Sequence, residues 1–150
     1  MDNRILESGA NIRVMTVAKT RVQSGLVFSN AARPETLLHG AAPLYTTPLG
    51  AAFAGDSREL LAKIPDSSVN LVFTSPPYAL HFKKEYGNVA KAEYVAWFLE
   101  FAKEIRRVLK DDGSFVLNVG GSYNAGTPTR SVYHFKLLIA LVEEIGFHLA

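Results

Sequence analysis

The sequence predicts an α/β fold in which a parallel sheet carries helices on its faces. Strand-like apolar segments alternate with segments of helical period from about residue 44 onward, and this alternation is typical of parallel sheets. We count only about three or four strands, fewer than a doubly wound sheet normally has. We therefore expect a partial sheet with flanking helices, truncated at the C-terminus and belonging to a larger domain.

The first 43 residues show no sustained periodicity of apolar residues. Scattered Gly, Ser, Asn and Pro lead us to expect an irregular or disordered extension over 1–43. Order is expected to begin near residue 44, with short strands at 44–46 and 51–54. The sequence thus divides into an extension, 1–43, and an ordered part, 44–150.

A short helix is expected to begin at Asp56. Its carboxylate can accept from the free N–H groups of a first helical turn, and Glu59 is placed for a capping box. The inward side chains of this helix would be Leu60, Leu61 and Ile64. A turn at 65–68 then leads to a strand at 69–73.

The clearest helix is predicted over 92–109. Its apolar residues recur at three- and four-residue spacing: Tyr94, Phe98, Phe101, Ile105 and Val108. Gly113 is expected to end the helix, in a position that tolerates positive φ. Three cations near this end, Arg106, Arg107 and Lys110, would complement the helix dipole.

A strand at 114–119 and a second amphipathic helix at about 132–145 complete the pattern. A loop from Gly120 to about Arg130 joins them. The inward side of the helix is expected to carry Phe135, Leu138, Leu141, Val142 and Ile145, with Gly146 just after its end. Residues 147–150 resemble the start of a further strand.

Composition narrows the class of protein. The chain has 150 residues, 48% hydrophobic and 20% charged, which fits one modest globular domain. It has no cysteine, which excludes disulfides and a thiolate nucleophile, and its four histidines show no metal-ligand spacing. A net charge of +2 does not establish a nucleic-acid partner. No apolar run reaches membrane-spanning length and no signal peptide is visible, so we expect a cytoplasmic protein.

The segment Thr74-Ser75-Pro76-Pro77-Tyr78 is the most informative of the chain, because it follows a strand directly. Two prolines fix φ and remove two backbone donors, so we expect a stiff shelf whose carbonyls point outwards. Ligands of open α/β sheets bind at the carboxyl ends of strands. A hydroxyl, a carbonyl and an aromatic face at this place suit a planar ring with an amino group. We expect the shelf to line the main concavity.

These five residues alone leave an ordinary proline loop equally open. His81 has no group nearby to orient it as a base, so we interpret it as a solvated loop residue. Lys83 and Lys84 lie beside the shelf, where phosphate contact and simple solvation are equally open.

A longer set of motifs favours the ligand-binding interpretation of this segment over an ordinary proline loop. The segments Ala54-Gly55-Asp56-Ser57, Thr74–Tyr78, Lys84-Glu85-Tyr86-Gly87-Asn88, Asp112-Gly113-Ser114-Phe115 and Gly120-Gly121 follow one another in order. Over residues 45–150 the sequence resembles the β-class amino-methylating DNA methyltransferases of restriction-modification systems. The resemblance implies a partial Rossmann-like methyltransferase sheet. It also implies S-adenosylmethionine as cofactor, double-stranded DNA as substrate and a restriction endonuclease as genetic partner.

Roles for individual residues follow from this resemblance. Ser at the first position of Ser75–Tyr78 is typical of cytosine-N4 enzymes, and Asp or Asn there of adenine-N6 enzymes. The Ser75 hydroxyl and the Pro76 carbonyl would accept from the cytosine amine. Tyr78, unless it is a core aromatic, would stack on the flipped base. Asp56, Ser57 and Thr74 would contact the cofactor, although helix capping explains Asp56 equally well.

The sequence also departs from the family. No Phe-x-Gly-x-Gly cofactor loop follows, and Gly120-Gly121 with Gly126 reads better as a flexible loop. Asn118 stands where close relatives can carry an acidic residue. We therefore expect the chain alone to be inactive. Two alternatives stay open: adenine-N6 methylation, and a non-catalytic α/β fragment that serves DNA binding or assembly.

Overall fold

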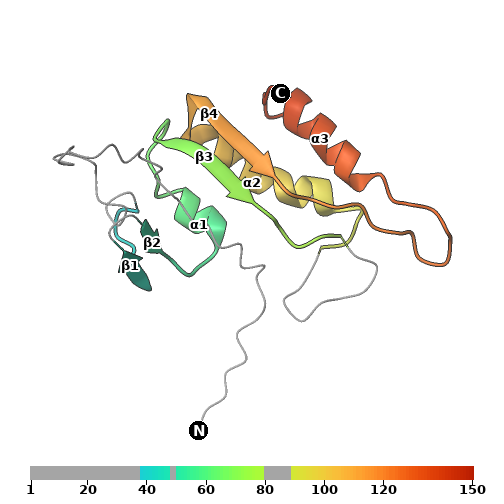
Figure 1. Cartoon of the computed structure of the whole chain (residues 1–150), viewed down its shortest axis with the longest axis horizontal. Helices are drawn as coiled ribbons and strands as arrows, with labels where there is room; N and C mark the ends of the chain where they lie inside the picture. Colours follow the sequence, from blue (N-terminus) through green and yellow to red (C-terminus); the bar gives the residue numbers. More distant parts are fainter. Residues whose placement is uncertain (1–37, 48–49, 80–88) are drawn as a thin grey trace, which may run out of the picture.

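The described part of the chain folds into two small sheets and three helices (Figure 1). The computed structural model describes residues 38–47, 50–79 and 89–150. The elements in order are β1 (Tyr45–Thr47), β2 (Gly50–Ala52), α1 (Ser57–Leu61), β3 (Val69–Thr74), α2 (Tyr94–Val108), β4 (Leu109–Leu117) and α3 (Tyr133–Glu143). The expectations for residues 1–37 and for His81, Lys83 and Lys84 lie outside the described residues.

The expected parallel pairing is confirmed by β3 and β4, which α2 connects. Val72 lies opposite Phe115 and Thr74 opposite Leu117, with an irregularity between Val69 and Leu71. The two predicted short strands are also present, as the antiparallel pair β1 and β2. Each sheet has two strands within the described residues, so the wider Rossmann-like sheet stays a prediction.

The core lies between the β3–β4 sheet and the helices, with α2 behind the sheet in Figure 1. All five predicted inward positions of α2 are buried: Tyr94, Phe98, Phe101, Ile105 and Val108. The ring of Phe98 stacks on that of Phe115 in β4, with centroids 6.5 Å apart. The alternate positions of the strands carry exposed apolar side chains, since Leu71, Phe73 and Val116 are 49%, 63% and 43% exposed. This is the face that α2 does not cover.

The expectation for Gly113 is wrong. Its φ is not among the positive values of the described glycines, and β4 begins directly at Leu109 instead of after a glycine-ended helix. A glycine is needed there for space. A Cβ would lie 2.9 Å from the Lys110 carbonyl oxygen and 3.1 Å from that of Val69, so the backbones approach too closely for a side chain.

The predicted inward face of α3 is only partly right. Leu141 is buried, but Phe135 is 57% exposed, and the buried positions near it are Tyr133 and Leu137. The helix is apolar around most of its circumference, so its period alone could not select the face that packs on α2.

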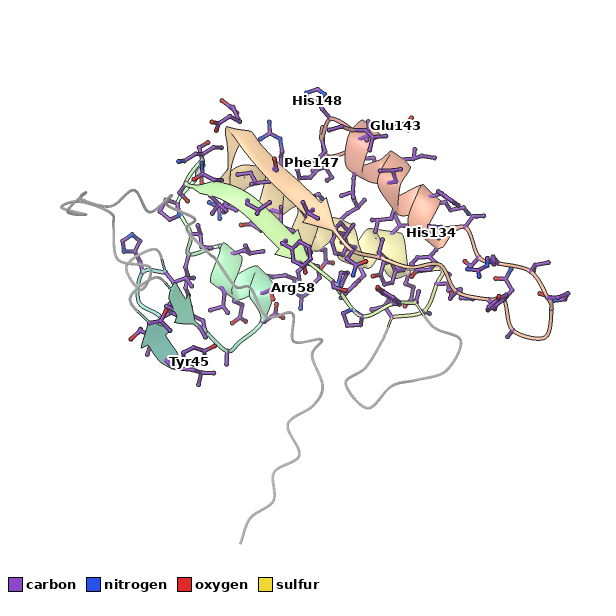
Figure 2. The ribbon with its side chains drawn as sticks, viewed as in Figure 1. Tyr45, Arg58, His134, Glu143, Phe147 and His148 are labelled. Atoms are coloured by element: carbon purple, nitrogen blue, oxygen red, sulfur yellow. The ribbon has the colours of Figure 1, made fainter. Side chains whose placement is uncertain are left out.

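The end of α3 agrees with the sequence. Gly146 has φ +81°, and the Phe147 amide donates at 3.1 Å to the carbonyl of Leu141, six residues earlier, so a left-handed glycine ends the helix as expected. Residues 147–150 form no strand, contrary to expectation. Instead the Phe147 ring lies 5.2 Å from that of Phe115, between α3 and β4 (Figure 2).

A cavity of about 730 Å³ lies between β4, α3 and the C-terminal residues. Leu117, His134 and Phe135 are among its lining residues, whereas none of Ser75 to Tyr78 is. The shelf does not line this particular cavity, and its place in the main concavity stays a prediction. Among the described helices, none is both long and apolar enough to cross a bilayer.

Candidate active site

The predicted shelf forms the loop that follows β3. Thr74 is the last residue of the strand, and residues 75–79 have no regular secondary structure. Ser75 is exposed, Pro76 is buried, and Pro77 and Tyr78 are half-buried. The shelf thus lies at the carboxyl end of a parallel strand, where ligands of α/β sheets bind. Tyr78 is not enclosed in the core.

The carbonyls of the shelf do not all point outwards, contrary to expectation. The hydroxyl of Tyr94, in the first turn of α2, donates to the Pro77 carbonyl at 2.9 Å. Among the described residues, no hydrogen bond reaches the Pro76 carbonyl. Of the two proline carbonyls, only that of Pro77 thus has a hydrogen-bond partner among the described residues.

Asn118 joins the end of β4 to the shelf. Its amide N–H donates to the Thr74 carbonyl at 2.9 Å. Its side-chain Nδ2 donates to Ser75 Oγ at 3.5 Å, the long limit of a hydrogen bond. A hydroxyl oxygen has two lone pairs, so Ser75 keeps one for a second donor.

Gly120 and Gly121 make room for neighbouring rings. A Cβ on Gly120 would lie 3.0 Å from Cε2 of Tyr78, and a Cβ on Gly121 would lie 3.0 Å from Cε1 of His134. The Tyr133 hydroxyl donates to the Gly120 carbonyl at 2.5 Å. The two glycines therefore have a packing role beside the shelf, which a freely flexible loop would not have.

The backbone beyond Tyr78 is held by another hydroxyl. Ser122 is 5% exposed and its Oγ donates to the Ala79 carbonyl at 2.9 Å. Burial raises the pKa of Tyr94, and the nearby hydroxyls of Tyr133 and Tyr78 raise it further. Burial likewise raises the pKa of Tyr133. Both phenols therefore keep their protons and stay donors at neutral pH.

Asp56 and Ser57 lie at the start of α1, as predicted. Asp56 is the N-cap: its Oδ1 accepts from the Arg58 amide at 2.9 Å and from Arg58 Nε at 3.1 Å, and its Oδ2 accepts from Arg58 Nη2 at 2.7 Å. The hydrogen bond with Arg58 lowers the pKa of the Asp56 carboxyl. Arg58 also pairs with Glu100 of α2 at 2.8 Å, which ties the two helices together. Ser57 is 1% exposed.

The carboxylate of Asp56 is mostly used within the chain. A carboxylate has about four acceptor sites, and Arg58 fills three of them. As far as the described residues go, one site on Oδ2 stays available at a side chain that is 30% exposed. Capping is thus observed, and a single further donor from a ligand fits the remaining site.

The sequence interpretation missed the hydroxyls that support the shelf. Tyr94 was assigned only to the apolar stripe of α2, and neither Ser122 nor Tyr133 was singled out. One signal was available for Tyr94: a buried tyrosine normally has a partner for its hydroxyl. Within the part of the chain that the structure describes, no three His, Cys, Asp or Glu side chains form a cluster that could hold a metal ion.

Comparison with known proteins identifies the family of the chain. The family of N6 and N4 methyltransferases described as DNA methylase matches residues 69–150. The type II methyltransferase M.PvuII of Proteus hauseri is 53% identical over 116 residues, which cover 77% of this chain and 34% of M.PvuII. M.SfiI of Streptomyces fimbriatus is 42% identical over 78 residues, or 49% of this chain and 18% of M.SfiI.

A solved structure is also similar. The PvuII DNA methyltransferase (cytosine-N4-specific) superposes with a TM-score of 0.65 at 54% sequence identity, over 73% of this chain and 39% of that one. The chain spans about a third of the length of M.PvuII. The family match covers more than half of the 150 residues, and the chain therefore belongs to the N6/N4 DNA methylase family.

Proposed function

We propose that this chain provides the catalytic shelf of an S-adenosylmethionine-dependent enzyme that methylates the N4 amine of cytosine in duplex DNA. The observation that carries the proposal is the Ser75–Tyr78 shelf at the carboxyl end of β3. The similarity to a structure titled cytosine-N4-specific supports the choice of base. Because the chain spans about a third of M.PvuII, the activity is proposed for the whole catalytic domain.

The chemistry requires acceptors on the amine of cytosine. That nitrogen is a poor nucleophile because its lone pair is delocalised into the ring. Ser75 Oγ has one lone pair beyond the contact with Asn118, and the Pro76 carbonyl is free of hydrogen bonds within the described residues. Two acceptors on the two N–H bonds would favour the lone-pair-rich nitrogen that attacks, which is electrostatic preorganisation.

Asn118 limits what Ser75 can do. Its neutral amide donates to the serine oxygen, so it orients the hydroxyl but cannot take a proton from it. We infer that Ser75 acts as a fixed acceptor, and that the proton lost by the amine leaves to water.

Tyr78 would hold the extruded base. An enzyme that acts on a base must take it out of the duplex, at a cost of a few kcal/mol. Stacking on an aromatic side chain recovers on the order of 1–3 kcal/mol. The half-buried Tyr78 ring is supported by Gly120 on one side, which suits a stacking surface held at a fixed angle.

The cofactor supplies the methyl group as a sulfonium, and Asp56, Ser57 and Thr74 are the proposed contacts to it. The open site on Asp56 Oδ2 fits one hydrogen-bond donor of such a ligand. The glycine-rich loop expected in the family is not part of residues 1–150. Asp56, Ser57 and Thr74 therefore account for only part of a cofactor site.

Nucleoside analysis of the reaction product tests the proposal. A chimera that joins residues 45–150 to the remaining part of M.PvuII would be incubated with labelled S-adenosylmethionine and duplex DNA. We expect N4-methylcytosine, and little of it from Ser75→Ala. N6-methyladenine would establish the adenine alternative. A folded chimera that binds DNA without methylating it, beside active M.PvuII, would favour the non-catalytic alternative.

A further inference from the structure

The carbonyls of the two residues that flank Tyr78 accept hydrogen bonds from hydroxyls in distant parts of the chain. Tyr94, 17 residues later, donates to the Pro77 carbonyl, and Ser122, 43 residues after Ala79, donates to the Ala79 carbonyl, both at 2.9 Å. Tyr94 is 0% exposed and Ser122 is 5% exposed. Each of these buried hydroxyls has a carbonyl next to Tyr78 in sequence as its partner, one on either side of that residue.

The shelf needs such external donors. Pro76 and Pro77 have no N–H, so this segment cannot be held by a continued strand ladder. The last backbone bond of the sheet in this direction is from Asn118 N to the Thr74 carbonyl. Beyond Thr74, the position of the loop depends on what binds its carbonyls.

The same cluster supports the ring of Tyr78. Gly120 leaves space against Cε2 of Tyr78, and the Tyr133 hydroxyl holds the Gly120 carbonyl at 2.5 Å. The rings of Tyr94 and Tyr133 meet edge to face, with centroids 4.9 Å apart. The hydroxyls that hold the two carbonyls and the glycine that contacts the Tyr78 ring therefore belong to one packed cluster, formed by α2, α3 and the loop after β4.

We propose that Tyr94 and Ser122 are positioning residues that fix the angle of the Tyr78 ring, with Gly120 as the seat of that ring. The inference rests on the proposed function, because the ring matters as the surface on which an extruded base stacks. An aromatic side chain captures a base only when its face is presented at the right angle, so the hydrogen bonds to the carbonyls of both neighbouring residues act on the capture step.

A structural experiment on the 150-residue chain tests the positioning without any methylation. Tyr94→Phe and Ser122→Ala each remove one hydroxyl and keep most of the packing. Matched controls are Tyr123→Phe, where the tyrosine is 54% exposed, and Ser114→Ala, at an exposed serine of β4. The readouts are the ¹³C shifts of the Pro77 and Ala79 carbonyls and the NOEs between the Tyr78 ring and Gly120.

We expect an upfield carbonyl shift at the anchored residue and weaker NOEs in each anchor variant, and wild-type spectra in both controls. Gly120→Ala should also weaken these NOEs, although this variant keeps all the hydroxyls. It tests the position of the Tyr78 ring if Tyr94→Phe or Ser122→Ala fails to fold. Unchanged NOEs in the folded anchor variants, or in Gly120→Ala, would overturn the proposal.

The functional consequence is measured in the chimera with 2-aminopurine at the target base. Loss of one hydrogen bond should reduce base capture about 3- to 10-fold in Tyr94→Phe, and leave the rate of methyl transfer to a captured cytosine unchanged. A wild-type capture constant would refute the functional role. If the chimera proves inactive while the NMR results hold, the proposed function fails and the anchoring of Tyr78 stands.

Discussion

Arg107→Met should destabilise the chain much more than the same change at its neighbour Arg106. The Arg107 guanidinium donates to the Leu61 carbonyl at 2.8 Å and to the Ile64 carbonyl at 2.9 Å, at the end of α1. It also pairs with Glu104 at 2.8 Å and with Asp66. The sequence interpretation gave Arg107 only a helix-dipole role, so this link between α2 and α1 is a finding of the structure.

The magnitude follows from the two carbonyls. A hydrogen bond from a charged donor contributes about 1.5–3 kcal/mol, and partly exposed ion pairs add about 0–1 kcal/mol. Arg107 is 29% exposed, so water replaces part of what is lost. We expect the free energy of unfolding to fall by about 2–3 kcal/mol, or roughly 5–10 °C in Tm for a chain of this size.

Urea unfolding followed by circular dichroism measures the effect, with Arg106→Met as the matched control. Arg106 is exposed, so its substitution should change the free energy of unfolding by less than about 0.5 kcal/mol. Equal stability of the two variants would refute the role of Arg107 as a tie between the helices.

Three further changes test other parts of the structure. Gly113→Ala should cost about 1–3 kcal/mol from crowding against backbone at 2.9 Å, measured by urea unfolding, and a loss no larger than about 0.3 kcal/mol would contradict the contact. Asp56→Asn keeps an N-cap but removes the charge paired with Arg58. Because the Asp56 pKa is lowered from 3.8, its contribution is present above that pH and lost as pH falls through the folded pKa. Wild-type stability should therefore fall more steeply below about pH 4 than that of the variant, and parallel pH profiles would argue against the pair. Phe73→Thr, at a side chain that is 63% exposed, should leave the free energy of unfolding within about 0.5 kcal/mol and reduce self-association seen by light scattering; a large loss of stability would mean that this face is covered.

Local patterns predicted most of the secondary structure. The helical stripe from Tyr94 to Val108 identified α2 and its buried face, because one side of that helix is polar. The face of α3 was misassigned because the helix is apolar almost all round, so only its packing against α2 selects Leu137 over Phe135. Gly113 was misread for a related reason: close approach of the backbone of Val69 depends on tertiary structure.

The candidate site likewise contains residues that the sequence locates and residues that only the tertiary structure locates. Ser75 to Tyr78 could be located from sequence, because two prolines after a strand are a local signal. The hydroxyls that support the shelf could not be located from sequence. Tyr94 and Ser122 are separated by 17 and 43 residues from the carbonyls to which they donate. Such pairs form only once α2 and the loop after β4 have packed.

The most direct test of the account compares Ser75→Ala with Tyr78→Ala in the chimera under single-turnover conditions. Ser75 is proposed to act on the amine, so its loss should slow methyl transfer at least about 100-fold while the 2-aminopurine signal of the extruded base survives. Tyr78 is proposed to hold the base, so its loss should weaken that signal, and a mismatched target should partly restore it. Wild-type methylation by Ser75→Ala, or unchanged base extrusion in Tyr78→Ala, would contradict the central claim that this shelf is where cytosine is bound and methylated.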